Sequence, residues 1–209
     1  MITEVLCIII AYLLGAIPTA YVAGRLRRGE DIRQLGGGNM GALNATRELG
    51  FKIGVIVLLA DAAKGAGAIL IARYLGVSQI WIFLAGFAAV VGHCWPVFLK
   101  FKGGKGAATT MGVFLGLTPP AFACSVPIML VVIAITSNVT LGMAFGFLFY
   151  PLWLWLFGQP TEMFIYAVLM VLFLAARYAP TALRAMKKAG NAENFLVEKN
   201  YKPWQSKRK

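Results

Sequence analysis

Three lysines and three glycines lie in the segment Phe98-Leu-Lys-Phe-Lys-Gly-Gly-Lys-Gly-Ala107, where one apolar stretch ends and another begins. Glycine lets successive backbone N–H groups point at one anion, and lysine supplies positive charge. The segment therefore predicts a phosphate site at a membrane surface. In the alternative interpretation the lysines only flank a membrane-spanning helix, as they often do. The choice between the two depends on a second glycine cluster upstream.

That second cluster is Leu35-Gly-Gly-Gly-Asn-Met-Gly-Ala-Leu-Asn-Ala-Thr-Arg47, which has four glycines in six positions. Asn39 and Asn44 can hydrogen-bond hydroxyls or phosphate oxygens, and Arg47 offers two parallel N–H donors. A flexible linker is the alternative, because glycine-rich stretches commonly serve as one. The cluster is short, contains no serine and ends in arginine. Together the two clusters favour an anion-binding site.

Four further polar residues lie within or at the ends of apolar stretches. Asp61 and Lys64 are three apart, so they share a helix face, and we expect a structural ion pair. Arg73, near the end of the same stretch, is expected to snorkel. His93 is the only histidine and precedes the lysine segment by about two helical turns. It is either a general base or a hydrogen-bonding group with no catalytic role, and the residues leave both interpretations open.

The composition is that of a membrane protein. Hydrophobic residues make up 59% of the 209 positions, charged residues only 13%, and the mean hydropathy is +0.74. The net charge of +12 falls in short patches between apolar runs, a distribution that argues against nucleic-acid binding. Three cysteines without paired spacing and one histidine exclude a zinc cluster. We expect no metal and no cofactor.

The hydropathy pattern predicts an all-α integral membrane protein with about seven transmembrane helices. The spans expected are about Thr3–Gly24, Ile53–Leu75, Gln79–Leu99, two shorter helices on either side of Thr118-Pro119-Pro120 within Ala107–Thr136, Leu141–Phe157 and Thr161–Tyr178. Small residues at Gly65, Gly67, Gly86 and Gly92 indicate close helix contacts.

The distribution of basic residues predicts the orientation. With the N-terminus outside, 18 of the 20 lysines and arginines fall in the inner segments 25–52, 100–106, 137–140 and 177–209. Cytoplasmic loops retain Lys and Arg, so the C-terminus and both glycine clusters are expected to be cytoplasmic. We divide the chain into a polytopic membrane catalytic domain, 1–180, and a basic cytoplasmic tail, 181–209.

Three blocks occur together in an order and spacing known from one enzyme family. They are Gly37-Gly-Asn39-x-Gly-Ala-x-Asn44-x-x-Arg47, Asp61-x-x-Lys64-Gly, and Gly92-His93-x-Trp-Pro-Val-Phe-x-x-Phe101-Lys-Gly-Gly-Lys-Gly106. Over about residues 1–145 the chain resembles the bacterial acyl-phosphate:glycerol-3-phosphate acyltransferases of the PlsY type. Thioester-using acyltransferases have His and Asp separated by four residues, whereas Phe98 occupies the Asp position here.

The resemblance implies seven spans, cytoplasmic active-site loops and an enzyme of the bacterial inner membrane. The implied reaction moves a fatty acyl group from acyl phosphate to the sn-1 hydroxyl of glycerol 3-phosphate. Its product is lysophosphatidic acid, in the first step of phospholipid synthesis. The expected partners are these two substrates and the lipid bilayer, with no nucleic acid and no obligate protein partner. A membrane transporter or anion-binding protein for a phosphate ester, and an inactive homologue, remain the alternatives.

The chemistry needs no protein nucleophile, because acyl phosphate is a mixed anhydride with a good leaving group. The site must bring two phosphates together and stabilise charge at the attacked carbonyl. His93, Lys105 and Asn39 are the expected catalytic residues. The expected substrate-binding residues are Gly37, Gly38, Gly41, Asn44, Arg47, Lys102, Gly103, Gly104, Gly106, Thr140, Arg177, Thr181 and Arg184. Either His93 or the donor's own phosphate is the base, and the resemblance implies the phosphate, with His93 orienting a substrate.

The sequence departs from the family pattern at several positions. Gly37 replaces a serine, Met40 a proline and Leu43 a threonine. In a third block, near the C-terminus, both arginines persist as Arg177 and Arg184, but a histidine and an asparagine have become Tyr178 and Thr181. That block resembles the family's acceptor-binding segment, so the resemblance supports the acyl-phosphate donor better than the acceptor.

Overall fold

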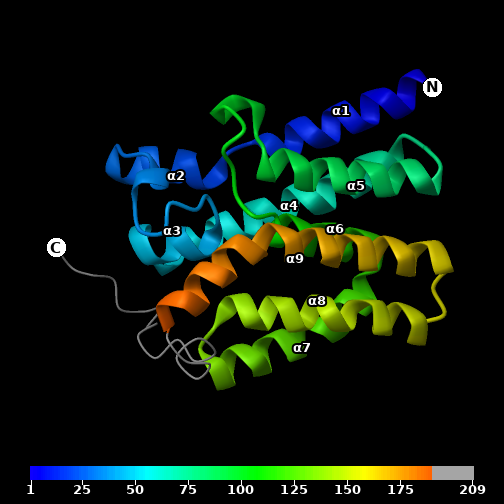
Figure 1. The fold of residues 1–209 in the computed structure, drawn as a ribbon. Helices are drawn as coiled ribbons and strands as arrows, with labels where there is room; N and C mark the ends of the chain where they lie inside the picture. The colour runs from blue at the N-terminus through cyan, green and yellow to red at the C-terminus, as the bar shows by residue number, and fades with distance from the viewer. Residues whose placement is uncertain (190–209) are drawn as a thin grey trace. The chain divides into compact units, whose positions relative to one another are not determined.

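The computed structural model describes residues 1–189, and every regular element within them is a helix (Figure 1). The helices are α1 (Ile2–Ala16), α2 (Thr19–Arg28), α3 (Ala42–Leu49), α4 (Phe51–Tyr74), α5 (Gln79–Cys94), α6 (Ala107–Leu117), α7 (Pro119–Thr136), α8 (Val139–Leu156) and α9 (Thr161–Ala189), with 3₁₀ turns η1 (Ile32–Gln34) and η2 (Val97–Leu99). Six segments of this part are long and apolar enough to cross a bilayer, and α6 is a shorter apolar helix. The prediction of an all-α membrane protein with about seven spans is confirmed.

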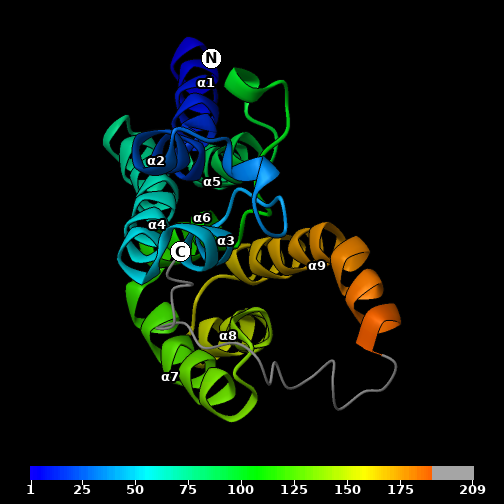
Figure 2. The same ribbon diagram turned by 90° about the vertical axis from the view of Figure 1, so that its left-hand side faces the viewer.

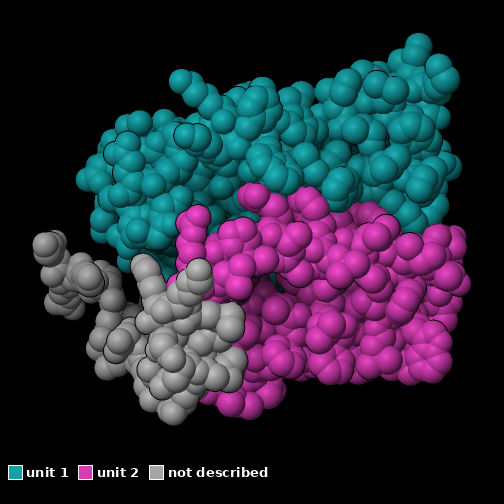
Figure 3. Space-filling model, in the orientation of Figure 1, with its two compact units in different colours: residues 1–117, 203–209 teal, residues 118–202 magenta. Residues whose placement is uncertain are grey.

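The chain forms two compact units, which Figure 3 colours separately. Among the described residues, 1–117 make the first unit, from α1 to α6, and 118–189 belong to the second, with α7, α8 and α9. Figure 2 looks onto the end of the first unit, where α2, η1 and α3 lie. Both glycine clusters belong to this first unit.

The first expected span is divided into two helices. Ile17 and Pro18 separate α1 from α2, and Ile17 leaves the helical conformation with ψ 118°. Proline has no N–H to donate and disfavours helical geometry at the residue before it, which explains the break. The break exposes the Ile17 carbonyl, and the Lys64 ammonium of α4 donates to it.

Glycines bring α1 and α5 together. A Cβ at Gly15 would collide with the backbone carbonyl of Ala89, and one at Gly92 would collide with that of Tyr12. Only a residue without a Cβ permits backbones to approach this closely. The predicted close helix contact at Gly92 is confirmed.

Glycines also allow α4 and α6 to pack closely. A Cβ at Gly65 would meet the carbonyl of Thr109, and one at Gly112 would meet the carbonyl of Ala62. Because α6 leaves the lysine segment directly, this contact fixes the end of that segment against α4. The predicted close contact at Gly65 is confirmed as well.

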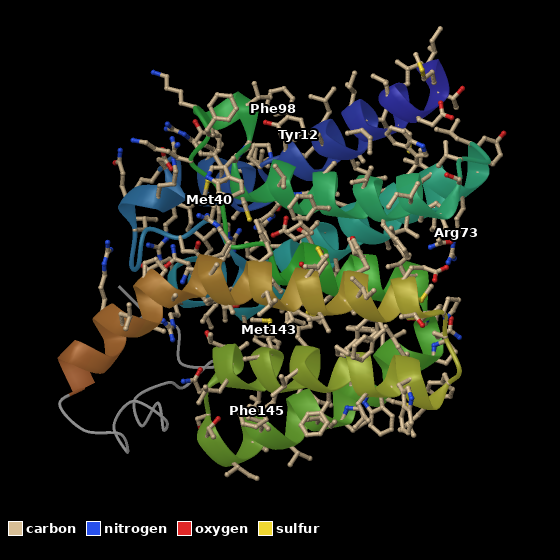
Figure 4. The ribbon with its side chains drawn as sticks, turned by 45° about the vertical axis from the view of Figure 1, so that its right-hand side comes forward. Tyr12, Met40, Arg73, Phe98, Met143 and Phe145 are labelled. Carbon is tan, nitrogen blue, oxygen red and sulfur yellow. The ribbon has the colours of Figure 1, made fainter. Side chains whose placement is uncertain are left out.

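Arg73, which we expected to snorkel, is exposed and also binds the end of α6. Its Nη1 donates to the Gly116 carbonyl and its Nη2 to the Leu117 carbonyl, both at 2.9 Å (Figure 4). These carbonyls lie at the C-terminal end of α6, where no further helical N–H reaches them. A cation there also opposes the negative end of the helix dipole. Arg73 therefore caps α6 before Thr118.

The second unit is assembled around α8. Glycines again allow close packing, since a Cβ at Gly142 or at Gly146 would collide with Met129 or its neighbours on α7. The hydroxyls of Thr118 and Tyr150 lie 2.5 Å apart in its interior. Helix α9 continues to Ala189, past the Tyr178 expected to end the last span. The boundary expected at residue 180 stays a prediction, and residues 190–209 of the tail lie outside the described part.

Candidate active site

Asn44 organises the first glycine cluster from inside. Its side chain is buried, and Oδ1 accepts a hydrogen bond from the Gly37 backbone N–H at 3.0 Å. Its Nδ2 donates to the carbonyls of Ile32 and Leu35, at 3.3 and 3.1 Å. An amide offers both an acceptor and two donors, so one asparagine fixes three points of the cluster. Asn44 therefore shapes the first glycine cluster through side-chain hydrogen bonds to the backbone in and just before that cluster.

A small apolar cluster underlies that loop and reaches the lysine segment. Its buried members are Ala20, Ile32, Met40, Ala45 and Val57. Leu99 packs against this cluster from the lysine segment, so the first glycine loop and the turn that begins the second share one core. Met40, which occupies the position of a family proline, is 4% exposed within it and is labelled in Figure 4.

Arg33 adds a polar connection between the same two segments. Its Nη1 donates to the Leu99 carbonyl at 3.3 Å, while Nε and Nη2 bind the Asp31 carboxylate, with Nη2 at 2.6 Å. The hydrogen bonds from Arg33 hold the pKa of the Asp31 carboxyl below its ordinary value. The guanidinium also lies 5.6 Å from the centre of the Tyr21 ring, a cation–π distance.

The second loop is fastened to the end of α5 through its glycines. Gly104 N–H donates to the His93 carbonyl at 3.0 Å, and Gly103 N–H donates to the Cys94 carbonyl at 3.2 Å. A Cβ at Gly103 would collide with the same His93 carbonyl, and one at Gly104 would collide with His93 Nε2. Both glycines are therefore required for the loop to pass this close to His93.

The turn before these glycines has an unusual backbone. Lys100 and Phe101 both have positive φ, 54° and 59°, although neither is glycine. Such residues are uncommon and are concentrated at functional sites. The side chains of Phe98 and Phe101 are 60% and 58% exposed, while Leu99 packs inward. Figure 4 shows Phe98 at the surface of this turn.

Lys105 lies two residues before Ala107, the first residue of α6. It is half-buried, and Gly106, which follows with φ 91°, is buried. Backbone N–H groups and the positive end of the dipole at a helix start attract anions, and a lysine beside them adds a full charge. Lys102 is exposed at the entrance of the same loop.

A buried charge cluster lies beneath the second loop. Asp61 is fully buried, and its Oδ1 lies 2.6 Å from Lys64 Nζ, 2.5 Å from the Thr19 hydroxyl that donates to it, and 3.6 Å from His93 Nδ1. The expected ion pair of Asp61 with Lys64 is confirmed. The sequence did not indicate that Thr19 and His93 would join it, because both come from other helices.

Four expected site residues belong to the second unit. Arg177, Thr181 and Arg184 lie on α9 at a spacing of four and then three residues, so they share one face of that helix. Thr181 and Arg184 are exposed, and Arg177 is half-buried. Thr140 is in the first turn of α8, where its backbone N–H donates to Asn138 Oδ1 at 3.1 Å.

Comparison with known proteins identifies the family of this chain. The family model described as glycerol-3-phosphate acyltransferase matches residues 5–188. The chain belongs to the glycerol-3-phosphate acyltransferases. It is 38% identical over 198 residues to glycerol-3-phosphate acyltransferase 1 of Dehalococcoides mccartyi, an alignment covering 91% of this chain and 95% of that one. It is 51% identical over 121 residues to the glycerol-3-phosphate acyltransferase of Geobacter metallireducens, an alignment covering 58% of this chain and 62% of that one.

The fold agrees with this family. The chain is similar to the crystal structure of PlsY (YgiH), an integral membrane glycerol 3-phosphate acyltransferase, in its glycerol 3-phosphate form. The TM-score is 0.82, the identity is 34%, and the match covers 88% of this chain and 92% of that one. The chain is also similar to the lysophosphatidic acid form of that protein, with a TM-score of 0.80 and 32% identity.

In this acyltransferase the first unit contains most of the residues that the sequence singled out. They are Gly37, Gly38, Asn39, Gly41, Asn44, Arg47, His93, Lys102, Gly103, Gly104, Lys105 and Gly106. Asn39 is half-buried in the first loop, and Arg47 is exposed in the last turn of α3. Their contact with substrate stays a prediction.

Sequence reasoning missed the pair of Asp31 and Arg33. Both residues lie in a loop, where charged residues are usually solvated, and nothing marked them as a connection to the other loop. The Asp-x-Arg spacing was the available signal, because an aspartate side chain readily accepts from the backbone two residues on. Asp31 Oδ1 does so from the Arg33 N–H at 3.0 Å.

Proposed function

We propose that this acyltransferase uses acyl phosphate as donor and the sn-1 hydroxyl of glycerol 3-phosphate as acceptor, giving lysophosphatidic acid and inorganic phosphate. Family membership supports the acceptor, because a relative of the same fold is described in a glycerol 3-phosphate form and a lysophosphatidic acid form. The donor is inferred from the chemistry that the two glycine loops can perform.

The observation that carries the proposal is the junction of the two loops at Leu99. Leu99 packs on the core of the first loop, and its carbonyl accepts from Arg33. The reaction needs two phosphates near each other, and two cationic, glycine-rich loops held side by side could bind them. A single loop flanking a helix would need no such connection to a partner.

In the proposed reaction the acceptor oxygen attacks the acyl carbonyl carbon. The carbonyl oxygen becomes an oxyanion, and its collapse breaks the bond to the phosphate oxygen and expels inorganic phosphate. Lys105 and the N-terminus of α6 neutralise the phosphate of the donor. Arg47 and Asn39 contact phosphate and hydroxyl oxygens from the first loop. Most of the rate comes from positioning and charge stabilisation, because the leaving group is already activated.

The proton of the attacking hydroxyl passes to the phosphate of the donor. The expelled phosphate then leaves with that proton, so that no protein base needs regeneration. His93 is not needed as the base in this step. Its Nε2 lies against Gly104, where a Cβ would collide with it, so the ring is placed to support the glycine–lysine loop. We assign His93 the orientation of the loop and of a bound substrate.

The proposed setting is the bacterial inner membrane with both glycine loops in the cytoplasm. Eighteen of 20 basic residues fall in segments assigned to the inner face when the N-terminus is outside. The substrates are water-borne or interfacial phosphates of the cytoplasm, which fits the same assignment. The catalytic domain is residues 1–180, including Arg177 at the acceptor, and the basic tail follows.

Purified protein in detergent or lipid vesicles, incubated with acyl phosphate and glycerol 3-phosphate, tests the proposal. We expect lysophosphatidic acid and inorganic phosphate to appear in equal amounts. Acyl coenzyme A offered in place of acyl phosphate is the matched control and should give no product. Folded protein that releases neither product from acyl phosphate contradicts the proposal. Movement of labelled glycerol 3-phosphate across vesicles without acyl transfer would indicate a transporter instead.

A further inference from the structure

Asp61 lies at the centre of a buried cluster drawn from three helices. Its Oδ1 is within 2.6 Å of Lys64 Nζ on α4, 2.5 Å of the Thr19 hydroxyl on α2 and 3.6 Å of His93 Nδ1 on α5. Asp61 is 0% exposed, and Lys64 and His93 are 5% and 8% exposed. Charges in such surroundings interact strongly, because water does not screen them.

Lys64 connects this cluster to the break between α1 and α2. Its ammonium donates to the Ile17 carbonyl, which also accepts from the Thr19 backbone N–H, and lies 3.3 Å from the Thr19 hydroxyl. These bonds, with the ion pair to Asp61, explain structurally why Lys64 is present: it binds the backbone at the break between α1 and α2. They do not explain why His93 also lies next to Asp61.

His93 gives the cluster a second connection, to the glycine–lysine loop. Its carbonyl accepts from the Gly104 N–H, and its ring Nε2 faces the Gly104 backbone so closely that a Cβ there would collide with it. The ring therefore lies between Asp61 on one side and the loop that carries Lys105 on the other.

We propose that Asp61 is a positioning residue for acyl transfer, holding the His93 ring through Nδ1 so that Nε2 stays against Gly104 and the loop keeps Lys105 in place. The catalytic consequence rests on the proposed function, whereas the position of the ring does not. At 3.6 Å the contact between Asp61 Oδ1 and His93 Nδ1 is longer than a hydrogen bond, so the carboxylate acts on the ring by electrostatic attraction, which favours a proton on Nδ1 and turns that nitrogen toward Asp61. A loop that shifts by about 1 Å can lose on the order of 100-fold in rate.

Because His93 is the only histidine in the chain, its ring can be observed directly. Protein labelled with ¹⁵N-histidine should show, in wild type, a proton on Nδ1. Asp61→Asn should shift the Nδ1 resonance, because the carboxylate that orients that proton has gone. A neutral ring with its proton only on Nε2 in the wild-type protein overturns the proposal. The wild-type spectrum by itself needs neither activity nor a variant.

A double variant separates positioning from a purely structural ion pair. Removing Asp61 alone leaves the Lys64 charge buried and unpaired, which destabilises the protein strongly. Asp61→Asn with Lys64→Met removes both charges, and replacing a whole buried pair is often nearly neutral for stability. We expect this double variant to be folded but at least about tenfold slower in acyl transfer. Wild-type turnover in the folded double variant overturns the proposal.

Thr109→Val is the matched control. Thr109 lies at the contact of α4 and α6, its Oγ1 is buried without a hydrogen-bond partner among the described residues, and valine has its shape. We expect wild-type turnover and an unchanged His93 spectrum from it. If wild-type protein shows the Nδ1 proton and its dependence on Asp61 but transfers no acyl group, the proposed function fails while the position of the ring stands.

Discussion

Arg33 donates a hydrogen bond from Nη1 to the carbonyl oxygen of Leu99, joining segments 66 positions apart in the chain. The same guanidinium pairs with Asp31, and Leu99 packs on the core beneath the first glycine loop. A rigid planar donor suits this task, because it can bind a carboxylate and a carbonyl at once. The relation means that a change at Arg33 is transmitted to both loops.

Arg33→Ala should therefore reduce activity as well as stability. Loss of hydrogen bonds from a charged group costs about 1.5–3 kcal/mol in partly buried sites. Since the Arg33 side chain is 28% exposed, we expect the lower part of that range in unfolding free energy. The Km for acyl phosphate should rise, measured by phosphate release. Arg33→Lys should be intermediate, because it keeps the charge but loses the planar fork.

Arg27→Ala is the control for Arg33. Arg27 is exposed in the last turn of α2. It should leave both the unfolding free energy and the Km near wild type. Equal effects at both positions would mean that Arg33 acts only through the overall charge of this face.

The pair of Asp31 and Arg33 also predicts a dependence of stability on pH. The hydrogen bonds from Arg33 lower the pKa of Asp31 relative to its ordinary value of about 3.9. The contribution is therefore complete above that ordinary value and is lost as pH falls through the lowered pKa. Thermal unfolding of Asp31→Asn should differ from wild type near neutral pH, and the difference should shrink toward acid pH. Glu30→Gln, at an exposed neighbouring carboxylate, should show no such trend.

Lys105→Ala should abolish turnover without unfolding the protein. A positive charge beside a helix N-terminus stabilises phosphate as the carbonyl is attacked, and loss of such a group commonly costs on the order of 100-fold or more in rate. Lys100 is exposed on the turn before the loop, so Lys100→Ala should cost far less. Initial rates of phosphate release, with circular dichroism as the check on folding, measure both. Equal, mild effects would show that the segment is only a basic flank.

Gly65→Ala and Gly67→Ala form a matched pair on α4. A Cβ at Gly65 meets the backbone carbonyl of Thr109, which cannot move without displacing α6, whereas one at Gly67 meets only the flexible Leu14 side chain at 3.3 Å. Overpacking typically costs about 1–3 kcal/mol, and backbone contact should place Gly65→Ala at or above the upper end. Thermal unfolding in detergent measures the difference. Similar melting temperatures for the two variants would contradict the close contact of α4 and α6.

The sequence predicted features that depend on neighbouring residues. Apolar runs of sufficient length predicted the helices that can cross a bilayer. The segment Thr118-Pro119-Pro120 predicted the division between α6 and α7, because proline cannot continue a helix. The spacing of Asp61 and Lys64 gave their ion pair, because residues three apart share a helix face.

What the sequence could not predict depends on residues far apart in the chain. Arg73 donates hydrogen bonds to carbonyls of α6 that are more than 40 positions away in the chain, and Arg33 donates to the Leu99 carbonyl from another loop. His93 joins Asp61 only because α4 and α5 lie together. Hydrophobic periodicity does not specify which faces meet in a membrane helix bundle, where nearly every face is apolar.

The altered third block gives a prediction about acceptor binding. Thr181 is exposed on α9, on one face with Arg177 and Arg184, where the family pattern has asparagine. A hydroxyl is shorter than an amide and has one donor fewer, so a bound phosphate or glycerol oxygen loses about 0.5–1.5 kcal/mol. Thr181→Asn should lower the Km for glycerol 3-phosphate several-fold and leave that for acyl phosphate unchanged, in steady-state kinetics. Ala179→Asn, on the opposite face, should change neither constant. A change in the donor constant alone would place α9 outside the acceptor site.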